Sequence, residues 1–194
     1  AKGERGLVPD EGGKQMKREN IRLPNDALWL LQTLRAAGHS AYVVGGCVRD
    51  SLLGRTPGDW DICTSARPEQ TRALFADRRL ILTGAKHGTV GVVLHGKPYE
   101  ITTYRQDGAY RDHRHPESVR FVGDLAGDLA RRDFTINAMA YAPGEGVIDL
   151  HGGRRDLTGG IIRCVGDPAA RFAEDALRIL RAVRFAARLD FAMD

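Results

Sequence analysis

Residues 45–62 read GGCVRDSLLGRTPGDWDI, and this stretch decides the fold. Immediately before it, Ala41–Val44 is a short apolar run of the kind that forms a buried strand. The run stops at Gly45-Gly46, and an apolar pattern with helical spacing follows. A strand that ends in two glycines and enters a helix lets backbone N–H groups approach a triphosphate closely. The first half of the stretch therefore predicts a turn suited to binding phosphates.

The second half of the stretch contains the pair Asp59 and Asp61, separated by Trp60. On an extended strand, residues i and i+2 point to the same face, about 6.6 Å apart. Two carboxylates on one face repel each other unless a cation lies between them. Such a pair can hold two Mg²⁺ ions about 4 Å apart, which stabilise the attacking and leaving oxygens of a phosphoryl transfer. We expect Trp60 to point into the core. An isolated Asp-x-Asp is more often a solvated strand face, so the prediction depends on its combination with the glycine turn.

The rest of the chain predicts an α+β fold. Residues 1–20 are rich in Gly, Lys and Glu, and we expect them to form a flexible lead. Apolar spacing predicts helices at 24–38, 48–53, 68–76, 125–129, 136–141, 152–157 (a short helix or turn) and, without a break, 169–189. Short apolar or alternating runs predict strands at 41–44, 59–62, 80–82, 90–94, 99–104 and 161–165. We expect residues 105–117 to form a long mobile loop. These elements favour a head domain at 21–166, with a small mixed sheet flanked by helices, followed by a helical region at 167–194.

Composition narrows the functional classes. The net charge of +4 and the pI near 9.2 permit a polyanionic partner without demanding one. No apolar run approaches the roughly 20 residues that span a bilayer, so we expect no membrane association. Cys47, Cys63 and Cys164 form no CxxC pair, which argues against a zinc site and a disulfide framework. We expect buried, reduced thiols in a cytoplasmic protein.

The stretch at 45–62 resembles the signature of the polymerase-β-type nucleotidyltransferases. The similarity is to the branch that contains bacterial CCA-adding enzymes and poly(A) polymerases. It implies a nucleotidyltransferase head in which Gly46 and Arg49 contact the nucleotide. It also implies that Asp59 and Asp61 are the catalytic residues and bind Mg²⁺.

A second segment, RRDFTINA at 131–138, resembles the next signature of the same family. Two adjacent arginines before an apolar run would also fit a solvated face. The resemblance implies that Arg132 contacts the nucleotide. Asp133 and Asn137 are then expected to support the site without touching the substrate.

A third segment, RFAEDALR at 171–178, continues to Arg181 and Arg184. On one continuous helix, steps of three would place Asp175, Arg178, Arg181 and Arg184 along one side, which a salt-bridged solvent face explains equally well. The resemblance implies that Asp175 and Arg178 recognise the base, because cytosine and adenine both present an amino group beside a ring nitrogen. It implies that Arg181 and Arg184 bind phosphates or position that pair.

Two further segments, TGAKHGTV at 83–90 and EITTYR at 100–105, are similar to the bacterial CCA-adding branch. Glu100 is equally compatible with a third acidic residue at the sheet face and with a glutamate at a strand edge. The stretch 105–119 resembles the flexible loop of CCA-adding enzymes, which favours addition of all three nucleotides.

Together the resemblances imply an enzyme that adds C, C and A to the 3′ end of tRNA from CTP and ATP, with release of pyrophosphate. Poly(A) polymerase and a CC-adding or A-adding specialist share the signatures and stay open. A non-catalytic nucleotide- or RNA-binding fragment is the alternative from another class. Relatives are longer and continue into helical neck, body and tail regions that grip tRNA. We therefore expect residues 167–194 to begin the neck, and the missing regions or a partner chain to supply the grip on tRNA.

Overall fold

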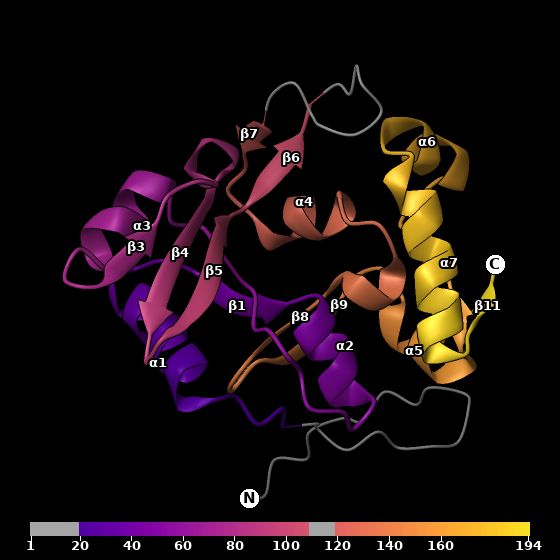
Figure 1. Cartoon of the computed structure of the whole chain (residues 1–194), viewed down its shortest axis with the longest axis horizontal. Coiled ribbons are helices and arrows are strands. Elements are labelled where there is room, and N and C mark those ends of the chain that lie inside the picture. Colours follow the sequence, from indigo (N-terminus) through magenta and orange to yellow (C-terminus); the bar gives the residue numbers. More distant parts are fainter. Residues whose placement is uncertain (1–19, 109–118) are drawn as a thin grey trace, which may run out of the picture.

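The computed structural model describes residues 20–108 and 119–194 (Figure 1). The flexible lead expected before residue 20 and the central part of the loop expected at 105–117 lie outside these residues. Within the two described stretches, no helix is both long and apolar enough to cross a bilayer.

A seven-stranded mixed sheet organises the molecule and confirms the predicted α+β class. Its order is β3 (Arg79–Ile81), β4 (Thr89–Leu94), β5 (Lys97–Thr103), β2 (Ile62–Thr64), β1 (Ala41–Val44), β8 (Met139–Ala142) and β9 (Gly146–Asp149). The pair β2–β5 is parallel, and the other five neighbouring pairs are antiparallel. The central strands β2 and β1 come from either side of the glycine turn, so this turn lies in the middle of the sheet.

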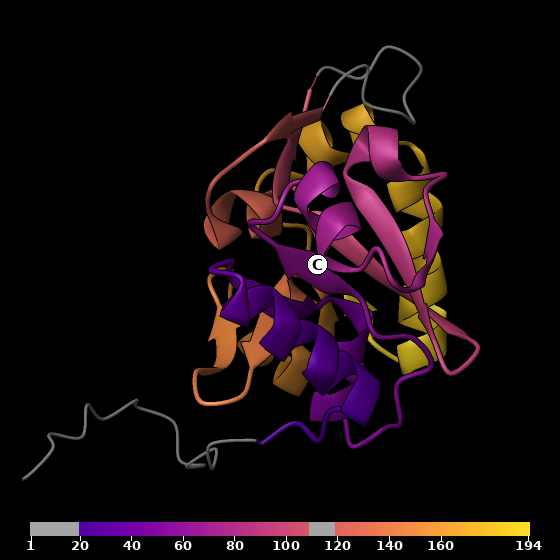
Figure 2. The ribbon, with the colours of Figure 1, turned by 90° about the vertical axis from the view of Figure 1, so that its left-hand side faces the viewer.

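Helices pack around the sheet, and α6 and α7 lie at one side of it (Figure 1). They are α1 (Asn25–Ala36), α2 (Gly46–Leu52), α3 (Pro68–Leu74), α4 (Leu125–Ala130), α5 (Gly153–Gly159), α6 (Pro168–Glu174) and α7 (Leu177–Leu189), with 3₁₀ turns η1 (Ala85–His87) and η2 (Thr135–Asn137). Two small ladders complete the fold: β6 (Arg105–Asp107) with β7 (Val119–Phe121), and β10 (Ile161–Ile162) with β11 (Ala192–Met193). In Figures 1 and 2, α1 and α7 lie on opposite sides of the molecule.

One buried apolar cluster joins most of these elements. Leu30, Leu31 and Leu34 of α1 are at most 1% exposed, because the helix turns them all toward the sheet. Phe185 and Leu189 of α7 belong to the same cluster. The first helices of the expected neck therefore share a core with the head.

Three predicted elements differ from the structure. The helix predicted at 136–141 is wrong: η2 ends at Asn137, and β8 follows with all four of its residues buried. A strand buried on both faces lacks alternation, so its apolar run imitates a helix. The strand predicted at 59–62 begins only at Ile62, although the Asp61 carbonyl accepts a hydrogen bond from Val44 N at 3.0 Å. The strand predicted at 161–165 ends at Ile162.

The unbroken helix predicted at 169–189 is also wrong. α6 ends at Glu174, and Asp175 has an extended backbone with φ −140° and ψ 103° before α7 begins. The expected loop at 105–117 starts with a strand, β6. No strand was predicted at 146–149, where β9 pairs with β8.

Candidate active site

The turn at Gly45-Gly46 joins β1 to α2. Gly45 has φ +81°, a backbone conformation that favours glycine, and its N–H donates to the Met139 carbonyl at 3.1 Å. A Cβ atom at Gly45 would lie 3.1 Å from Nη1 of Arg132. A Cβ atom at Gly46 would meet only Nη2 of Arg49, at an ordinary 3.7 Å. The fold therefore requires glycine at position 45 and does not require it at position 46.

Asp59 and Asp61 lie directly before β2, and both are exposed. Trp60 between them is 9% exposed and belongs to the core, as predicted. The parallel register pairs Ile62 with Ile101, so Asp61, just before β2, lies near Glu100 of β5. The structure thus brings three acidic residues to one edge of the central sheet.

The pKa of Asp61 records this crowding of negative charge. Burial of part of the side chain raises the pKa, and the charge of Glu100 raises it further. The positive charge of Arg132 acts in the opposite direction, and Asp59 again raises the pKa. Asp61 therefore lies within electrostatic reach of Arg132, Glu100 and Asp59 simultaneously. A cation at this edge would relieve the repulsion.

Among the described residues, no three His, Cys, Asp or Glu side chains converge closely enough to enclose a metal ion by themselves. This arrangement fits Mg²⁺, which usually binds one or two protein carboxylates and completes its octahedron with water and substrate phosphates. It does not fit Zn²⁺ in a closed structural site, which needs four protein ligands.

Arg132 is held beside the glycine turn by a buried carboxylate. Its Nη2 donates to Oδ2 of Asp128 at 3.1 Å, while Arg131 donates to Oδ1 from two nitrogens at 2.8 and 3.0 Å. Burial alone would raise the pKa of Asp128, but the charges of Arg132 and Arg131 outweigh it and leave this pKa below its usual value. Although burial disfavours its charged form, the charge of Asp128 keeps the pKa of Arg132 above its usual value. A permanent positive charge therefore faces Gly45 and Asp61.

Arg49 is in the interior and is only 5% exposed. Its Nη1 donates to Oδ1 of Asn137 at 2.6 Å, and its Nε donates to Oδ1 of Asp50 at 2.8 Å. Its guanidinium also lies 5.0 Å from the centre of the Phe185 ring. Besides the nucleotide contact predicted for it, Arg49 joins α2 to η2 and α7.

Asp133 and Asn137 connect Arg49 to α7 by hydrogen bonds. Oδ1 of Asp133 accepts from Nδ2 of Asn137 at 3.2 Å, and Asn137 in turn accepts from Arg49. Oδ2 of Asp133 accepts from Nε of Arg181 at 2.7 Å. A continuous chain of polar contacts therefore runs from α2 through η2 to α7.

The third signature is arranged differently from the expected helical face. Asp175 lies at the break between α6 and α7, where its Oδ1 accepts from the Leu177 N–H at 2.9 Å. Arg178 is 6% exposed and donates to Oε2 of Glu174 and to the Arg171 carbonyl, rather than to Asp175. The structure therefore does not form the Asp175–Arg178 pair.

The other two arginines of this signature follow on α7. Arg181 is half exposed and bound to Asp133, and Arg184 is exposed. Neither side chain lies in the interior as Arg178 does. Of the predicted residues, the structure brings Gly46, Arg49, Asp61 and Arg132 together around the glycine turn, with Asp59 at its acidic edge.

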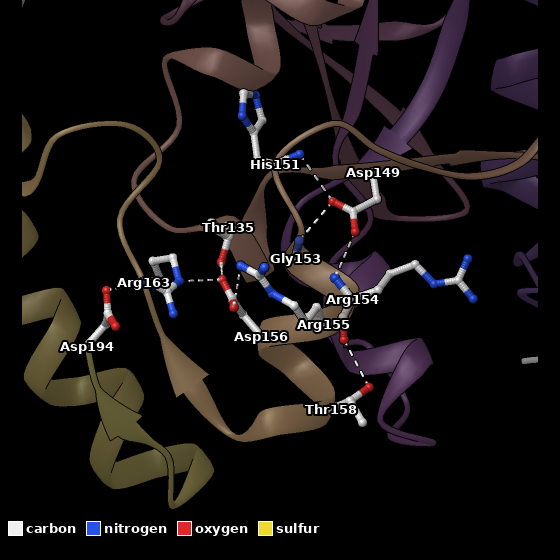
Figure 3. A network of polar contacts seen from close by, with 10 residues as sticks. All are labelled: Thr135, Asp149, His151, Gly153, Arg154, Arg155, Asp156, Thr158, Arg163 and Asp194. Carbon is white, nitrogen blue, oxygen red and sulfur yellow. Dashed lines mark hydrogen bonds and ion pairs between the residues drawn. The ribbon is translucent and has the colours of Figure 1, made fainter. Parts of the chain in front are cut away.

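A polar network behind η2 fixes the position of that turn (Figure 3). Asp156 of α5 is 1% exposed and accepts from Oγ1 of Thr135 at 2.7 Å and from Nε of Arg163 at 3.1 Å. Asp149 accepts from the N–H groups of Gly153 and Arg154 and so holds the first turn of α5. These contacts anchor Thr135, the first residue of the turn that presents Asn137 to Arg49.

The closest backbone approach in this region is at Gly153. A Cβ atom there would lie 2.2 Å from the Thr135 carbonyl oxygen, so α5 can approach η2 only with glycine at this position. Sequence reasoning missed this brace. The glycine pair and the single acidic residue, Asp156, in HGGRRD at 151–156 were its only signal.

Comparison with known proteins places these features in a family. Residues 41–163 match the family described as the poly(A) polymerase head domain. The chain is 54% identical over 168 residues to the CCA-adding enzyme of Geobacillus stearothermophilus, covering 87% of this chain and 41% of that protein. The corresponding enzyme of Ligilactobacillus salivarius is 51% identical, with the same coverage.

Solved structures agree. The CCA-adding enzyme of Bacillus stearothermophilus in complex with CTP superposes with a TM-score of 0.78 at 50% identity, over 87% of this chain and 40% of that one. The Thermotoga maritima CCA-adding enzyme complexed with tRNA_CCA superposes with a TM-score of 0.70 at 32% identity, over 88% of this chain and 38% of that one. This chain thus spans about two fifths of the length of the relatives it matches.

Proposed function

The chain belongs to the poly(A) polymerase head-domain family, and from that premise we propose that it is the catalytic part of a CCA-adding tRNA nucleotidyltransferase. The reaction is attack of an RNA 3′-hydroxyl on the α-phosphate of CTP or ATP, with release of pyrophosphate. Close relatives are CCA-adding enzymes, one of them solved with CTP and another with tRNA_CCA. We infer the same substrates for this chain.

The arrangement that carries the proposal is the acidic pair beside the glycine turn. Asp59 and Asp61 would hold Mg²⁺, which when bound activates the attacking hydroxyl and neutralises charge on the triphosphate. The first turn of α2, which begins at Gly46, offers backbone N–H groups, and Arg132 presents a fixed positive charge next to them. No side chain has to act as a nucleophile, because positioning and charge stabilisation suffice for phosphoryl transfer.

Recognition of the base is assigned to the corner between α6 and α7. We propose that Asp175 and Arg178 read the amino group and ring nitrogen of cytosine or adenine, and that Arg181 and Arg184 position them or bind phosphates. For Arg178 this requires exchange of its bond to Glu174 for a bond to the base. Arg49 completes the nucleotide-binding set from the interior side.

The acidic pair is tested by replacing one carboxylate without changing its shape. The chain at high concentration is incubated with Mg²⁺ and a tRNA that lacks CCA, and each nucleoside triphosphate is offered separately. We expect incorporation from CTP, and Asp59→Asn should lower its rate by about 10²–10⁴-fold because charge stabilisation worth several kcal/mol is lost.

The matched control is Asp77→Asn. Asp77 is exposed and, within the described part of the chain, pairs only with the adjacent Arg78, so its loss should leave incorporation unchanged. If Asp59→Asn incorporated nucleotides at the wild-type rate, Asp59 would not be a metal ligand. No incorporation by the unaltered chain, with intact CTP binding, would instead favour a non-catalytic binding fragment.

Products formed with CTP and ATP together distinguish the close alternatives. A CCA-adding enzyme stops after three nucleotides, whereas a poly(A) polymerase, whose family name this head domain carries, extends with A alone. A CC-adding specialist stops after two nucleotides. We propose the first outcome, since the most similar curated relatives reported above are CCA-adding enzymes.

The share of the relatives that this chain covers leads to a second proposal. We infer that the chain binds nucleoside triphosphate but holds tRNA weakly, because the regions matching the remaining three fifths of those proteins are not included in it. Tight and specific tRNA binding by this chain in a filter-binding titration would contradict this. We further propose a cytoplasmic location, where the free, buried thiols of Cys47, Cys63 and Cys164 would stay reduced.

A further inference from the structure

A cavity of about 990 Å³ opens beside Asp59, the first residue of the acidic pair, and Asp61 does not line it. Three separate segments form its walls: residues 20–24 before α1, residues 51, 52 and 54–60 from the end of α2 to the start of β2, and residues 97–99 at the start of β5. Asp59 lies in its wall, whereas Gly46 and Arg132 do not line it. The cavity therefore adjoins the reaction centre without overlapping the expected triphosphate site.

The charge of this cavity is unbalanced. Arg22, Arg55 and Lys97 lie in its walls, one from each segment, and all three are exposed. In the described part of the chain, none of these three side chains forms an ion pair or a side-chain hydrogen bond, whereas Arg35 pairs with Glu145. Asp59 is the sole acidic residue among those lining the cavity. Unpaired positive charge in a hollow concentrates anions there.

The shape and lining fit a chain rather than a compact ion. The three cations come from three different segments, so they can follow successive phosphates along a strand. The cavity is also lined by the partly exposed Leu23 and Pro57 and the exposed Pro98, apolar surfaces against which sugars and bases can pack. A nucleic acid strand needs this combination of spaced cations and an apolar floor.

The position of Asp59 in the wall of the cavity indicates which nucleic acid strand the cavity would bind. In the proposed reaction, the attacking 3′-hydroxyl must reach the acidic pair from a side that the triphosphate does not occupy. We propose that this cavity receives the last nucleotides of the RNA acceptor, with Arg22, Arg55 and Lys97 contacting its backbone phosphates. This inference rests on the proposed function, since it takes the acceptor to be RNA.

The test compares two triple variants that lose the same charge. The cavity variant is Arg22→Gln/Arg55→Gln/Lys97→Gln. The control variant, Arg72→Gln/Arg79→Gln/Arg188→Gln, changes exposed cations that do not line this cavity. Binding of a short single-stranded RNA with a free 3′-hydroxyl is measured by fluorescence anisotropy at several salt concentrations, and binding of CTP is measured in parallel.

We expect the cavity variant to bind RNA at least about tenfold more weakly at low salt, with CTP affinity and thermal unfolding unchanged. Three lost phosphate contacts should reduce the slope of log affinity against log salt by about 2. Equal weakening in both variants, no weakening in either, or a loss confined to CTP binding would each overturn the proposal. Because these readouts need no catalysis, they stay informative even if the unaltered chain incorporates no nucleotide, which would count against the proposed function alone.

Discussion

Asp133 and Arg181, 48 residues apart in sequence, are joined by two contacts between one carboxylate oxygen and the guanidinium, at 2.7 Å from Nε and 2.6 Å from Nη2. Asp133 is 9% exposed, and its other oxygen accepts from Asn137. The same carboxylate therefore connects α7 with the turn that supports Arg49. Phe185, one turn further along α7, lies with its ring 5.0 Å from the Arg49 guanidinium and 5.4 Å from that of Arg181.

Replacement of Asp133 by Asn should lower the free energy of unfolding by about 1–2 kcal/mol. Hydrogen bonds to charged groups contribute roughly 1.5–3 kcal/mol, and the half-exposed Arg181 places this one near the lower end. Urea unfolding of Asp133→Asn, Arg181→Gln and the double variant measures the coupling. Additive effects of the two substitutions would contradict a direct interaction. Arg188→Gln, an exposed change on the same helix, is the control and should have little effect.

The two adjacent glycines should respond differently to alanine. Gly45→Ala forces a side chain into a positive-φ conformation and against Arg132, so we expect a loss of about 1–3 kcal/mol in stability. Gly46→Ala meets only an ordinary contact at the start of a helix and should leave stability unchanged or raise it by up to about 1 kcal/mol.

If Gly46 admits the triphosphate to the backbone, Gly46→Ala should still weaken CTP binding, by at least about tenfold. Isothermal titration with CTP, alongside thermal unfolding, separates the two effects. Unchanged CTP affinity in a stable Gly46→Ala variant would exclude a close approach of the phosphates to this backbone.

The close packing of α5 against η2 at Gly153 should not tolerate an added methyl group. Gly153→Ala would bring a Cβ atom to 2.2 Å from the Thr135 carbonyl, so α5 must move away from the turn, at a cost of about 2–4 kcal/mol. Gly123→Ala is the matched control, because its Cβ atom would meet no atom within 4 Å. Circular dichroism melts compare the two, and equal melting temperatures would show that this close approach does not constrain the fold.

The buried Asp128 should make stability depend on acid pH. Its folded pKa is below the unfolded value of about 3.9, so its contribution is complete above that value and is lost as pH falls through the folded pKa. Asp128→Asn removes this contribution at every pH. The stability difference between wild type and Asp128→Asn should therefore be largest near pH 6 and shrink toward pH 3. Urea unfolding across this range measures it, and a constant difference would be the contrary result.

Local patterns predicted the centre of the fold well. The alternation at Asp59-Trp60-Asp61 correctly placed Trp60 in the core, because one buried face suffices to set the rotation of an extended segment. The turn at Gly45-Gly46 was visible because only glycine accepts its backbone conformation. Both features depend on neighbours in sequence, and sequence contains that information directly.

Features that depend on distant contacts were not predictable in this way. β8 was mistaken for a helix, since burial on both of its faces erased the alternation that marks a strand. The break at Asp175 was missed because the helical pattern continues through it in sequence, while the Asp175 side chain satisfies the N–H of Leu177 instead.

The place of β1 in the sheet has a consequence for synthesis of the protein. One edge of β1 pairs with β2, which follows it closely in sequence. The other edge pairs with β8, which begins only at Met139. While the nascent chain leaves the ribosome, that edge is an apolar strand with unsatisfied backbone groups, open to pairing with other chains. Chaperone protection should therefore matter most before residue 142 emerges, and truncations that end earlier should aggregate.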